Sequence, residues 1–218
     1  MTGDYVLRRY SSADRGAFLD LFSAVLGGSM GEEWFAWKYV NNPYFEAVPI
    51  VVAEAAGRLV GARACLPLRV TAGDRSYTAL QPCDTMVREE HRRQGLFTRM
   101  TERVVDWFGE STDFFFNFPN HNSLPGNRKL GWRVVDTPST YYRVQNPAAF
   151  GVSAGAAGRR LARAYLGIRD WVADGGSFEV RWTDRVPPSL LGHEDGRLCA
   201  ARDETFYDWR LDTPLWSY

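Results

Sequence analysis

The sequence predicts an α/β (α+β) fold, in which a mixed and mostly antiparallel sheet is flanked by helices. Three observations predict it. A strand and two helices open the chain, a run of three β-strands fills residues 49–87, and a helix at 95–108 is followed by the apolar strand "DFFFNFP". The helices show apolar residues at a spacing of three to four, and the strands are bounded by turn-forming residues.

The first elements have clear boundaries. Residues 5–10, "YVLRRY", predict a short strand. The next segment begins with Ser and Asp, which cap helices, and stops at the pair Gly27-Gly28. A second helix is predicted over 31–43, where Asn-Asn-Pro ends it.

The central strands are joined by two turns. Residues 49–70 hold two apolar runs with a turn at Ala56-Gly57, and "TAGDRS" (71–76) predicts the next hairpin turn. The third strand (77–87) contains Pro82, which cannot donate to a sheet ladder. We therefore expect a bulge or an open edge there.

One amphipathic helix and one buried strand follow. The predicted inner face of the helix carries a set of apolar side chains: Leu96, Phe97, Met100, Val104, Val105 and Phe108. An apolar run such as 113–119 is typical of a strand inside a sheet. A loop with a short irregular helix and the last strands, up to about residue 145, complete this unit.

The rest of the chain predicts a separate region. A Pro-, Gly- and Ala-rich stretch (146–158) precedes an amphipathic helix (159–174), a strand "SFEVRW" and a helix around "ETFYDWR". "FAWKYVNNP" (35–43) is similar to "FYDWRLDTP" (206–214). We therefore expect one domain over 1–147, then a linker helix and the start of a second, incomplete lobe over 148–218.

Composition excludes several classes of function. The net charge is zero, which argues against a nucleic-acid or membrane partner, and the N-terminus lacks the apolar stretch of a signal peptide. Neither the three cysteines nor the three histidines have the spacing of metal ligands, so we expect no metal. A cytoplasmic protein fits these observations best.

"HRRQG" is the most informative segment. It stands between a predicted strand and a predicted helix, and the first turn of a helix presents free N–H groups that bind phosphate. The segment is neither a Walker P-loop nor a dinucleotide fingerprint. By itself it fits an anion-binding loop or a solvated start of a helix.

The same residues resemble the acetyl-CoA motif of the GNAT acetyltransferase superfamily, [RQ]-x-x-G-x-[GA]. Arg92-Arg93-Gln94-Gly95-Leu96-Phe97 follows that pattern except at Phe97, where the family has Gly or Ala. The family's second motif is similar to residues further along: Asn120, Ser123, Lys129, Gly131 and Trp132. The residues "HRRQGL" also resemble the corresponding segment of tandem acetyltransferases of the enhanced-intracellular-survival type, as does the second lobe predicted to follow.

The resemblance implies a fold, a cosubstrate and site residues. Two parallel strands would splay apart, and the pantetheine arm of acetyl-CoA would lie between them. The residues implied in binding it are Met86 and Val87 through their backbone, Arg92, Arg93, Gln94, Gly95, Leu96 and Phe97 at the diphosphate, and Asn120 along the arm. The reaction would be direct attack of an amine on the thioester.

Proton transfer needs further groups. An alkyl ammonium has a pKa of about 10.4, so a base must accept its proton; Asp84 is the first candidate, with Glu32 and Glu33 as others. The family's tyrosine acid falls at Asn127, and asparagine cannot act as an acid. Ser123, Tyr141, Tyr142 or water would have to act instead.

A set of aromatic residues either lines an acceptor pocket or packs the core: Trp34, Trp37, Tyr39, Tyr44 and Phe45.

Four functions remain open at this point. The first is an N-acetyltransferase for a small-molecule or peptide amine, with a homodimer allowed. The second is a weakly active or inactive module that binds acyl-CoA, which the missing tyrosine favours. Two further functions rank below these. An aminoacyl transferase acting on cell-wall precursors usually lacks such a diphosphate motif, and a nucleic-acid reader needs a basic surface, which the zero net charge argues against.

Overall fold

The computed structural model describes residues 4–28, 30–136, 160, 164 and 196–214. The chain divides into two compact units. One comprises residues 1–133 together with 185–218, and the other comprises residues 134–184. The elements described below belong to the first unit.

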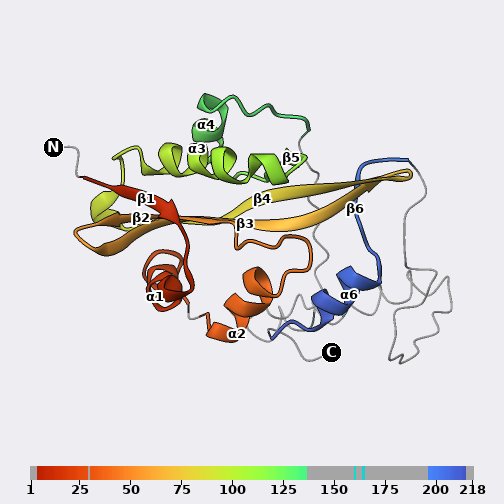
Figure 1. Cartoon of the computed structure of the whole chain (residues 1–218), viewed down its shortest axis with the longest axis horizontal. Coiled ribbons are helices and arrows are strands. Elements are labelled where there is room, and N and C mark those ends of the chain that lie inside the picture. Colours follow the sequence, from red (N-terminus) through yellow and green to blue (C-terminus); the bar gives the residue numbers. More distant parts are fainter. Residues whose placement is uncertain (1–3, 29, 137–159, 161–163, 165–195, 215–218) are drawn as a thin grey trace. The chain divides into compact units, whose positions relative to one another are not determined.

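A twisted mixed sheet forms the centre of this unit (Figure 1). Its strands are β1 (Val6–Arg9), β2 (Ile50–Ala55), β3 (Arg58–Ala72), β4 (Arg75–Val87) and β5 (Phe114–Phe115), in this spatial order. All neighbours are antiparallel except β4 and β5, which are parallel. A further strand, β6 (Cys199–Ala200), pairs with β3 at Val70 and Thr71.

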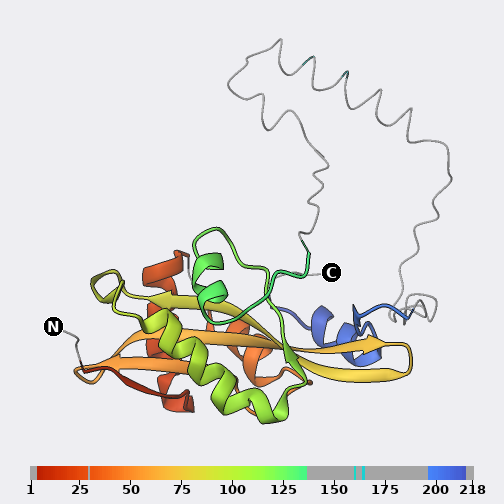
Figure 2. The same ribbon diagram turned by 90° about the horizontal axis from the view of Figure 1, so that it is seen from above.

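Helices cover both faces of the sheet. On one face lie α1 (Arg15–Leu26) and α2 (Glu32–Phe35), which continues as a π-helical turn (Ala36–Val40). On the other face, α3 (Leu96–Phe108) crosses the strands and contacts α4 (Leu124–Lys129), as Figure 2 shows from above. Single 3-10 turns stand at Ser12–Asp14, Glu89–His91 and Gly109–Ser111.

Each face of the sheet has its own hydrophobic core. Under α1 and α2 the core is aromatic, and its fully buried members include Phe18, Phe35 and Tyr39. Under α3 it is mostly aliphatic, with Leu96, Met100, Val104 and Phe108 facing the sheet. The four residues lie on one stripe of α3, as the helical periodicity predicts. The predicted inner residue Val105 is instead 41% exposed, because it lies beside that stripe.

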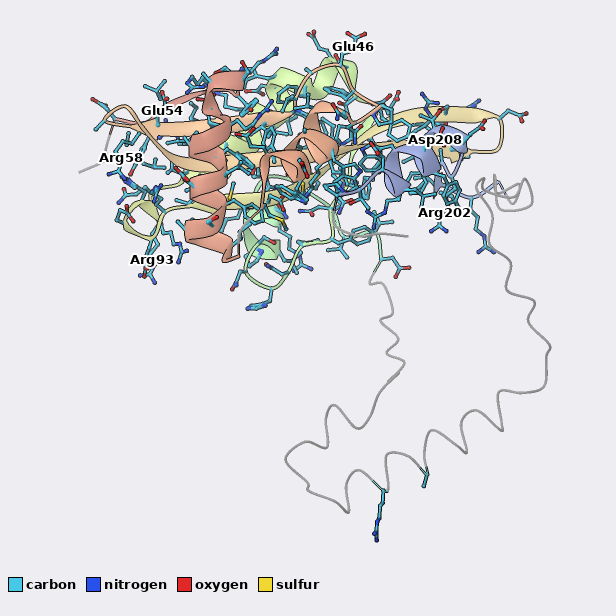
Figure 3. The ribbon with its side chains drawn as sticks, turned by 90° about the horizontal axis from the view of Figure 1, so that it is seen from below. Glu46, Glu54, Arg58, Arg93, Arg202 and Asp208 are labelled. Carbon is cyan, nitrogen blue, oxygen red and sulfur yellow. The ribbon has the colours of Figure 1, made fainter. Side chains whose placement is uncertain are left out.

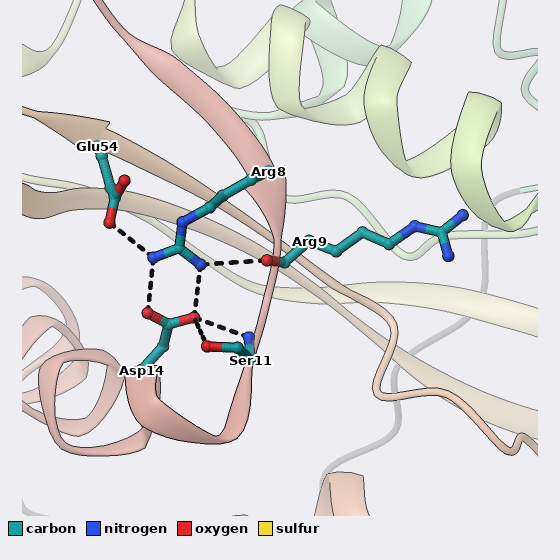
Figure 4. A network of polar contacts seen from close by, with 5 residues as sticks. All are labelled: Arg8, Arg9, Ser11, Asp14 and Glu54. Carbon is teal, nitrogen blue, oxygen red and sulfur yellow. Dashed lines mark hydrogen bonds and ion pairs between the residues drawn. The ribbon is translucent and has the colours of Figure 1, made fainter.

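A polar network fixes the start of the chain against β2 (Figure 4). The Arg8 guanidinium donates to both carboxylate oxygens of Asp14 at 2.7 Å and to Glu54 at 2.6 Å. Ser11 donates to Asp14 through both its N–H and its hydroxyl. The hydrogen bonds from Arg8 are the main reason why the pKa of Asp14 falls to about 2.

The segment 196–214 packs on the same sheet and helices. Helix α6 (Glu204–Leu211) starts at Asp203, whose carboxylate accepts from the Phe206 N–H. The rings of Trp209 and Trp37 stack, with centroids 5.1 Å apart and planes 6° apart. Each indole N–H donates to the backbone carbonyl of the other residue, at 2.8 and 2.9 Å. This reciprocal pair joins α6 to the turn that follows α2.

Most of the predicted elements are confirmed, with one clear correction. The strand predicted over 113–119 is only Phe114–Phe115, and both residues are half-buried. Its predicted place inside the sheet stays a prediction, because the strands expected to follow it lie largely outside the described residues. The last strands were predicted from residue 132 onward, and residues 132–136 form no strand. The rest of that segment, the helix at 159–174 and the strand "SFEVRW" lie outside the described residues, apart from positions 160 and 164.

Candidate acyl-transfer site

Strands β4 and β5 part along their length. They pair only at Ala79–Phe114 and Leu80–Phe115. Within the described residues, β4 from Gln81 to Val87 therefore has no strand partner on its β5 side. Pro82 lies at this open edge, as the sequence predicted. Proline has no N–H to donate, and on the open side no strand is there to accept one.

A β-bulge interrupts β4 beside this opening. The register between β3 and β4 shifts so that Asp84 and Thr85 lie opposite Arg63. Asp84 adopts a left-handed backbone with φ 41°, which is rare for a residue other than glycine. Successive residues here point to opposite faces, since Asp84 contacts residues of the α2 region and Thr85 contacts Arg63.

The loop after β4 presents donors at the start of α3. Arg93 (φ 61°) and Gly95 (φ 74°) are both left-handed, and Gly95 is the N-cap of the helix. Within the described residues, no backbone carbonyl accepts from the N–H groups of residues 93–97. Residues 92–95 are exposed, and Arg93 extends outward (Figure 3). Together these groups form an exposed, positively polarised surface that suits a phosphate or diphosphate.

Phe97 fills the place where the family motif has Gly or Ala. A methyl group built on Gly126 of α4 would lie 2.7 Å from the Cε1 atom of Phe97. Gly126 therefore leaves the room that the phenyl ring occupies. Gly126 thus accommodates Phe97, the residue that departs from the family pattern.

Asp84 is held in a cluster rather than free. Its Oδ2 accepts from the Lys38 ammonium and from the Tyr39 hydroxyl, each at 2.5 Å. The Lys38 nitrogen lies 4.9 Å from the Trp34 ring centroid and 5.3 Å from that of Tyr39. Burial raises the pKa of Tyr39 far above 10 and that of the Cys83 thiol to about 11. The carboxylate thus already binds one alkyl ammonium between aromatic faces.

Arg63 is a buried cation without a carboxylate partner in the described residues. Only 2% of its surface is exposed, and Nη1 donates to the Thr85 hydroxyl, while Nε and Nη2 have no acceptor. The Phe97 ring covers the guanidinium, 4.7 Å from centroid to Cζ. Burial lowers the pKa of Arg63, because desolvation disfavours the charged form.

The predicted residues of the second motif lie on α4 and the turn before it. The exposed Asn120 has a capping role, since its Oδ1 accepts from the backbone of Asn122 and Ser123 and from the Ser123 hydroxyl. Asn127 is 2% exposed, and neither atom of its amide has a partner. The structure thus places a buried amide, rather than an acid, where the family has its tyrosine.

The other candidates are dispersed. The Met86 side chain is fully buried in the aromatic core, and Val87 lies half-buried at the end of β4, where its carbonyl accepts from Arg92 Nε at 3.2 Å. Glu32 and Glu33 are exposed at the start of α2. Tyr141 and Tyr142 lie outside the described residues.

The aromatic residues proposed as an acceptor pocket mainly build the core. Trp34, Trp37, Tyr39 and Tyr44 are each at most 8% exposed, and Phe45 packs against Phe108. Among them, only Trp34 and Tyr39 also flank the Lys38 ammonium.

Sequence reasoning missed Lys38, Arg63 and Thr85. A readable signal existed for one of them, because Arg63 is a single charge inside the apolar run "LVGARACLPL". Lys38 gave no such signal, since a lysine on an amphipathic helix is usually exposed. Neither a membrane-spanning helix nor a cluster of three metal-ligating side chains occurs in the portion of the chain that is described.

The parted strands β4 and β5, with free N–H groups at the start of α3 beside them, define an α/β protein with an opening in its sheet next to a helix N-terminus. Residues 6–135 match the model of the acetyltransferase (GNAT) domain. The match covers more than half of the chain, so the protein belongs to the GNAT acetyltransferase family. The recognition from the loop motif is thereby confirmed, as is the fold class.

Solved structures show the same fold at low sequence identity. Glucosamine-6-phosphate N-acetyltransferase from Arabidopsis thaliana is 14% identical, with a TM-score of 0.50 over 64% of this chain and 98% of that one. The aminoglycoside acetyltransferase meta-AAC0020, from an uncultured soil metagenomic sample, is 17% identical, with a TM-score of 0.51 over 64% and 95%. No curated protein matches the sequence. Family and fold together support acyl transfer in general.

Proposed function

We propose that this protein is an N-acetyltransferase that transfers the acetyl group of acetyl-CoA directly to an amine. The observation that supports this most is the set of free N–H groups at residues 93–97 beside the unpaired edge of β4. A diphosphate can bind the first, and a pantetheine arm can pair with the second. The acceptor would be a small molecule or a peptide, with no nucleic acid, membrane or metal involved, in the cytoplasm, and a homodimer is compatible with this function.

The residues present fit this cosubstrate. Any Cβ at Gly95 would meet no atom within 4 Å, so the loop surface is open to a bound group. Arg92 and Arg93 add positive charge beside it. The unpaired amide of Asn127 offers N–H donors and a carbonyl acceptor, which suit an amide of the arm. Asn120 keeps its amide NH2 free of the capping bonds for the same arm.

The chemistry requires a neutral amine and a stabilised oxyanion. In the proposed reaction, Asp84 accepts a proton from the acceptor ammonium, directly or through water, and the amine attacks the thioester carbon. A backbone N–H of β4 near Met86 or Val87 donates to the developing oxyanion. The C–S bond then breaks, its electron pair stays on sulfur, and the new amide nitrogen releases its second proton to solvent. Lys38 must leave Asp84 for this, which makes the ion pair a resting state.

Asp84 is suited to bind an ammonium. In the structure it already holds that of Lys38, with aromatic rings on two sides. The acceptor amine would replace it. Ser123 is a less direct candidate for proton transfer, because its hydroxyl already donates to Asn120.

One observation favours a second function. Asn127, buried at the usual position of the acid, cannot give a proton to the leaving thiolate. The protein would then bind acyl-CoA as a weakly active or inactive regulatory module. The same cosubstrate site serves both functions, and turnover distinguishes them.

Thermal-shift titration tests binding, and a thiol-release assay over an amine panel tests turnover. Acetyl-CoA should raise Tm, whereas ATP and an oligonucleotide should not. Gly95→Glu should abolish this shift, because it places a carboxylate at the diphosphate. Gly73→Glu is the matched control, since Gly73 is also left-handed and open but lies in the β3–β4 turn. Equal shifts in both variants would contradict the site.

We also propose that residues 148–218 contain a linker helix and the first elements of a second GNAT-like lobe. Helix α6 supports this. When Trp209 is matched with Trp37, the N-cap Asp203 matches Gly31 and Pro214 falls one residue short of Pro43. A π-helical turn holds one more residue than an α-helical turn, and the first copy has such a turn at Ala36–Val40.

A further inference from the structure

A buried arginine lies next to the open edge of β4, and nothing in the described part of the molecule neutralises it. Arg63 stands on β3 opposite the bulge of β4, with its guanidinium on the α3 face. Two of its three nitrogens have neither solvent nor an acceptor. Such a group is costly to leave unpaired, so its presence needs an explanation.

The environment of Arg63 points toward an anion at the opening. Its Nη1 holds the hydroxyl of Thr85, a residue on the unpaired part of β4. Its face is covered by Phe97, which contacts Gly126 on α4. The next residue, Asn127, has an unpaired amide. Buried polar groups without partners thus occur on both β3 and α4.

Asp84 does not neutralise Arg63, although the two residues are opposed across the bulge. The Asp84 carboxylate turns to the α2 side, where Lys38 and Tyr39 bind it. The positive charge therefore remains available on the α3 side. The half-buried Phe97 ring covers the guanidinium, so a ligand would reach Arg63 only when this ring turns aside.

We propose that Arg63 binds the sulfur of coenzyme A and stabilises the thiolate that leaves when the amine displaces it. This role rests on the proposed function. It gives the leaving thiolate the stabilisation that Asn127, which cannot donate a proton as an acid, does not provide. As the C–S bond breaks, the electron pair stays on sulfur beside a permanent cation, and no proton has to be transferred at that moment. The thiolate takes its proton later, from solvent.

The proposal is testable without any acceptor. An unperturbed cysteine thiol has a pKa of about 8.5, and the thiol of coenzyme A likewise ionises in alkaline solution. A site that prefers the thiolate therefore binds coenzyme A more tightly as the pH rises. Calorimetry should compare coenzyme A with desulfo-coenzyme A between about pH 6 and about pH 9.5. The ratio of their affinities cancels every titration of the protein that affects both ligands. We expect this ratio to rise about tenfold, which corresponds to a thiol pKa lowered by about one unit.

Variants assign the effect to Arg63. Arg63→Met should keep coenzyme A binding but make the ratio flat, and Arg63→Lys should retain part of the rise. Arg58→Met is the matched control, because Arg58 begins the same strand and points outward (Figure 3). Arg63→Met should also raise Tm, since it removes an unpaired buried charge, whereas a merely structural arginine would lower Tm on removal.

The outcomes separate the two proposals. A flat ratio in the wild type, with coenzyme A bound, would overturn the role of Arg63 and leave the proposed function intact. Absence of coenzyme A binding would overturn both. A ratio that rises equally in the wild type and in Arg63→Met would assign the effect to another group and so reject Arg63.

Discussion

Replacing Trp209 with alanine should destabilise the whole first unit. Trp209 is 8% exposed, stacks on Trp37 and exchanges two hydrogen bonds with it. Although it is 172 residues from Trp37 in sequence, it belongs to the same core cluster as Phe18 and Phe35. Its loss therefore affects the packing that holds α2 and the following turn, where Lys38 and Tyr39 lie.

The size of the effect follows from the lost contacts. A buried Trp→Ala change costs about 3–5 kcal/mol in packing and cavity terms. The Trp37 carbonyl also loses its donor, which costs about 1–3 kcal/mol where water cannot replace it. Relaxation of the site offsets part of this, so we expect about 4 kcal/mol. Trp209→Phe keeps a stacked ring and loses only the hydrogen bond, and should cost about 2 kcal/mol.

Urea unfolding followed by far-UV circular dichroism measures the change, because the signal does not depend on the tryptophan removed. With a slope of about 2 kcal/mol/M, the midpoint should fall by about 2 M. Trp107→Ala on α3 is the control, since Trp107 is partly exposed and should cost about 1 kcal/mol. A Trp209→Ala variant within about 1 kcal/mol of the wild type would show that α6 is not an integral part of this unit.

Two further substitutions and one labelling experiment have defined outcomes. Asp84→Asn keeps a side chain that tolerates the left-handed backbone at φ 41°, so the fold should survive while kcat falls at least about tenfold; unchanged kcat would exclude Asp84 as the base. Asp14 has its pKa lowered to about 2, below the unfolded value of about 3.9, so its stabilisation is present above about pH 4 and lost as the pH falls toward 2. Asp14→Asn should therefore remove roughly 2 kcal/mol at neutral pH and flatten the acid limb of stability measured by urea titration; the same acid slope in both proteins would contradict this. The pKa of Cys83 is raised to about 11 by burial, so iodoacetamide at about pH 8 should label Cys83 more slowly in the folded than in the urea-unfolded protein, as followed by peptide mass spectrometry, and equal rates would contradict the packing.

The sequence predicted the fold well where local signals agree with packing. The turn at Ala56-Gly57, the N-cap at Gly95 and the stripe of α3 follow from glycine conformation and helical periodicity. The length of the strand predicted over 113–119 was wrong, because apolar content alone does not determine how far a strand stays paired. Only two of its residues pair with β4, and the parting of the strands that follows is a tertiary feature.

The site was predictable in part for the same reason. The loop at residues 92–97 is a local motif, and its geometry was readable from the glycine and the helix start. The contacts of Asp84 were not, because Lys38 precedes it by 46 residues and reaches it only when α2 packs on the sheet. Arg63 was readable as an anomaly, but its unpaired nitrogens depend on which side chains the bulge turns toward it.

The bulge in β4 gives the proposed reaction its division of charge. Side chains of consecutive residues in a strand point to opposite faces, and here Asp84 faces the α2 side while Thr85 faces Arg63. A carboxylate and a guanidinium so close in the sheet would neutralise each other if they met. Because the sheet separates them, the carboxylate remains able to bind an ammonium and accept its proton, while the cation remains able to bind the departing thiolate. The two demands of direct acetyl transfer, one for a base and one for an anion stabiliser, would thus be met on opposite faces of one strand.

This arrangement predicts that Asp84 and Arg63 variants act independently. The fold loss of kcat/KM in the double variant Asp84→Asn/Arg63→Met should then equal the product of the fold losses in the two single variants. A double variant no worse than the poorer single one would show that the two groups act as one unit and would refute the division.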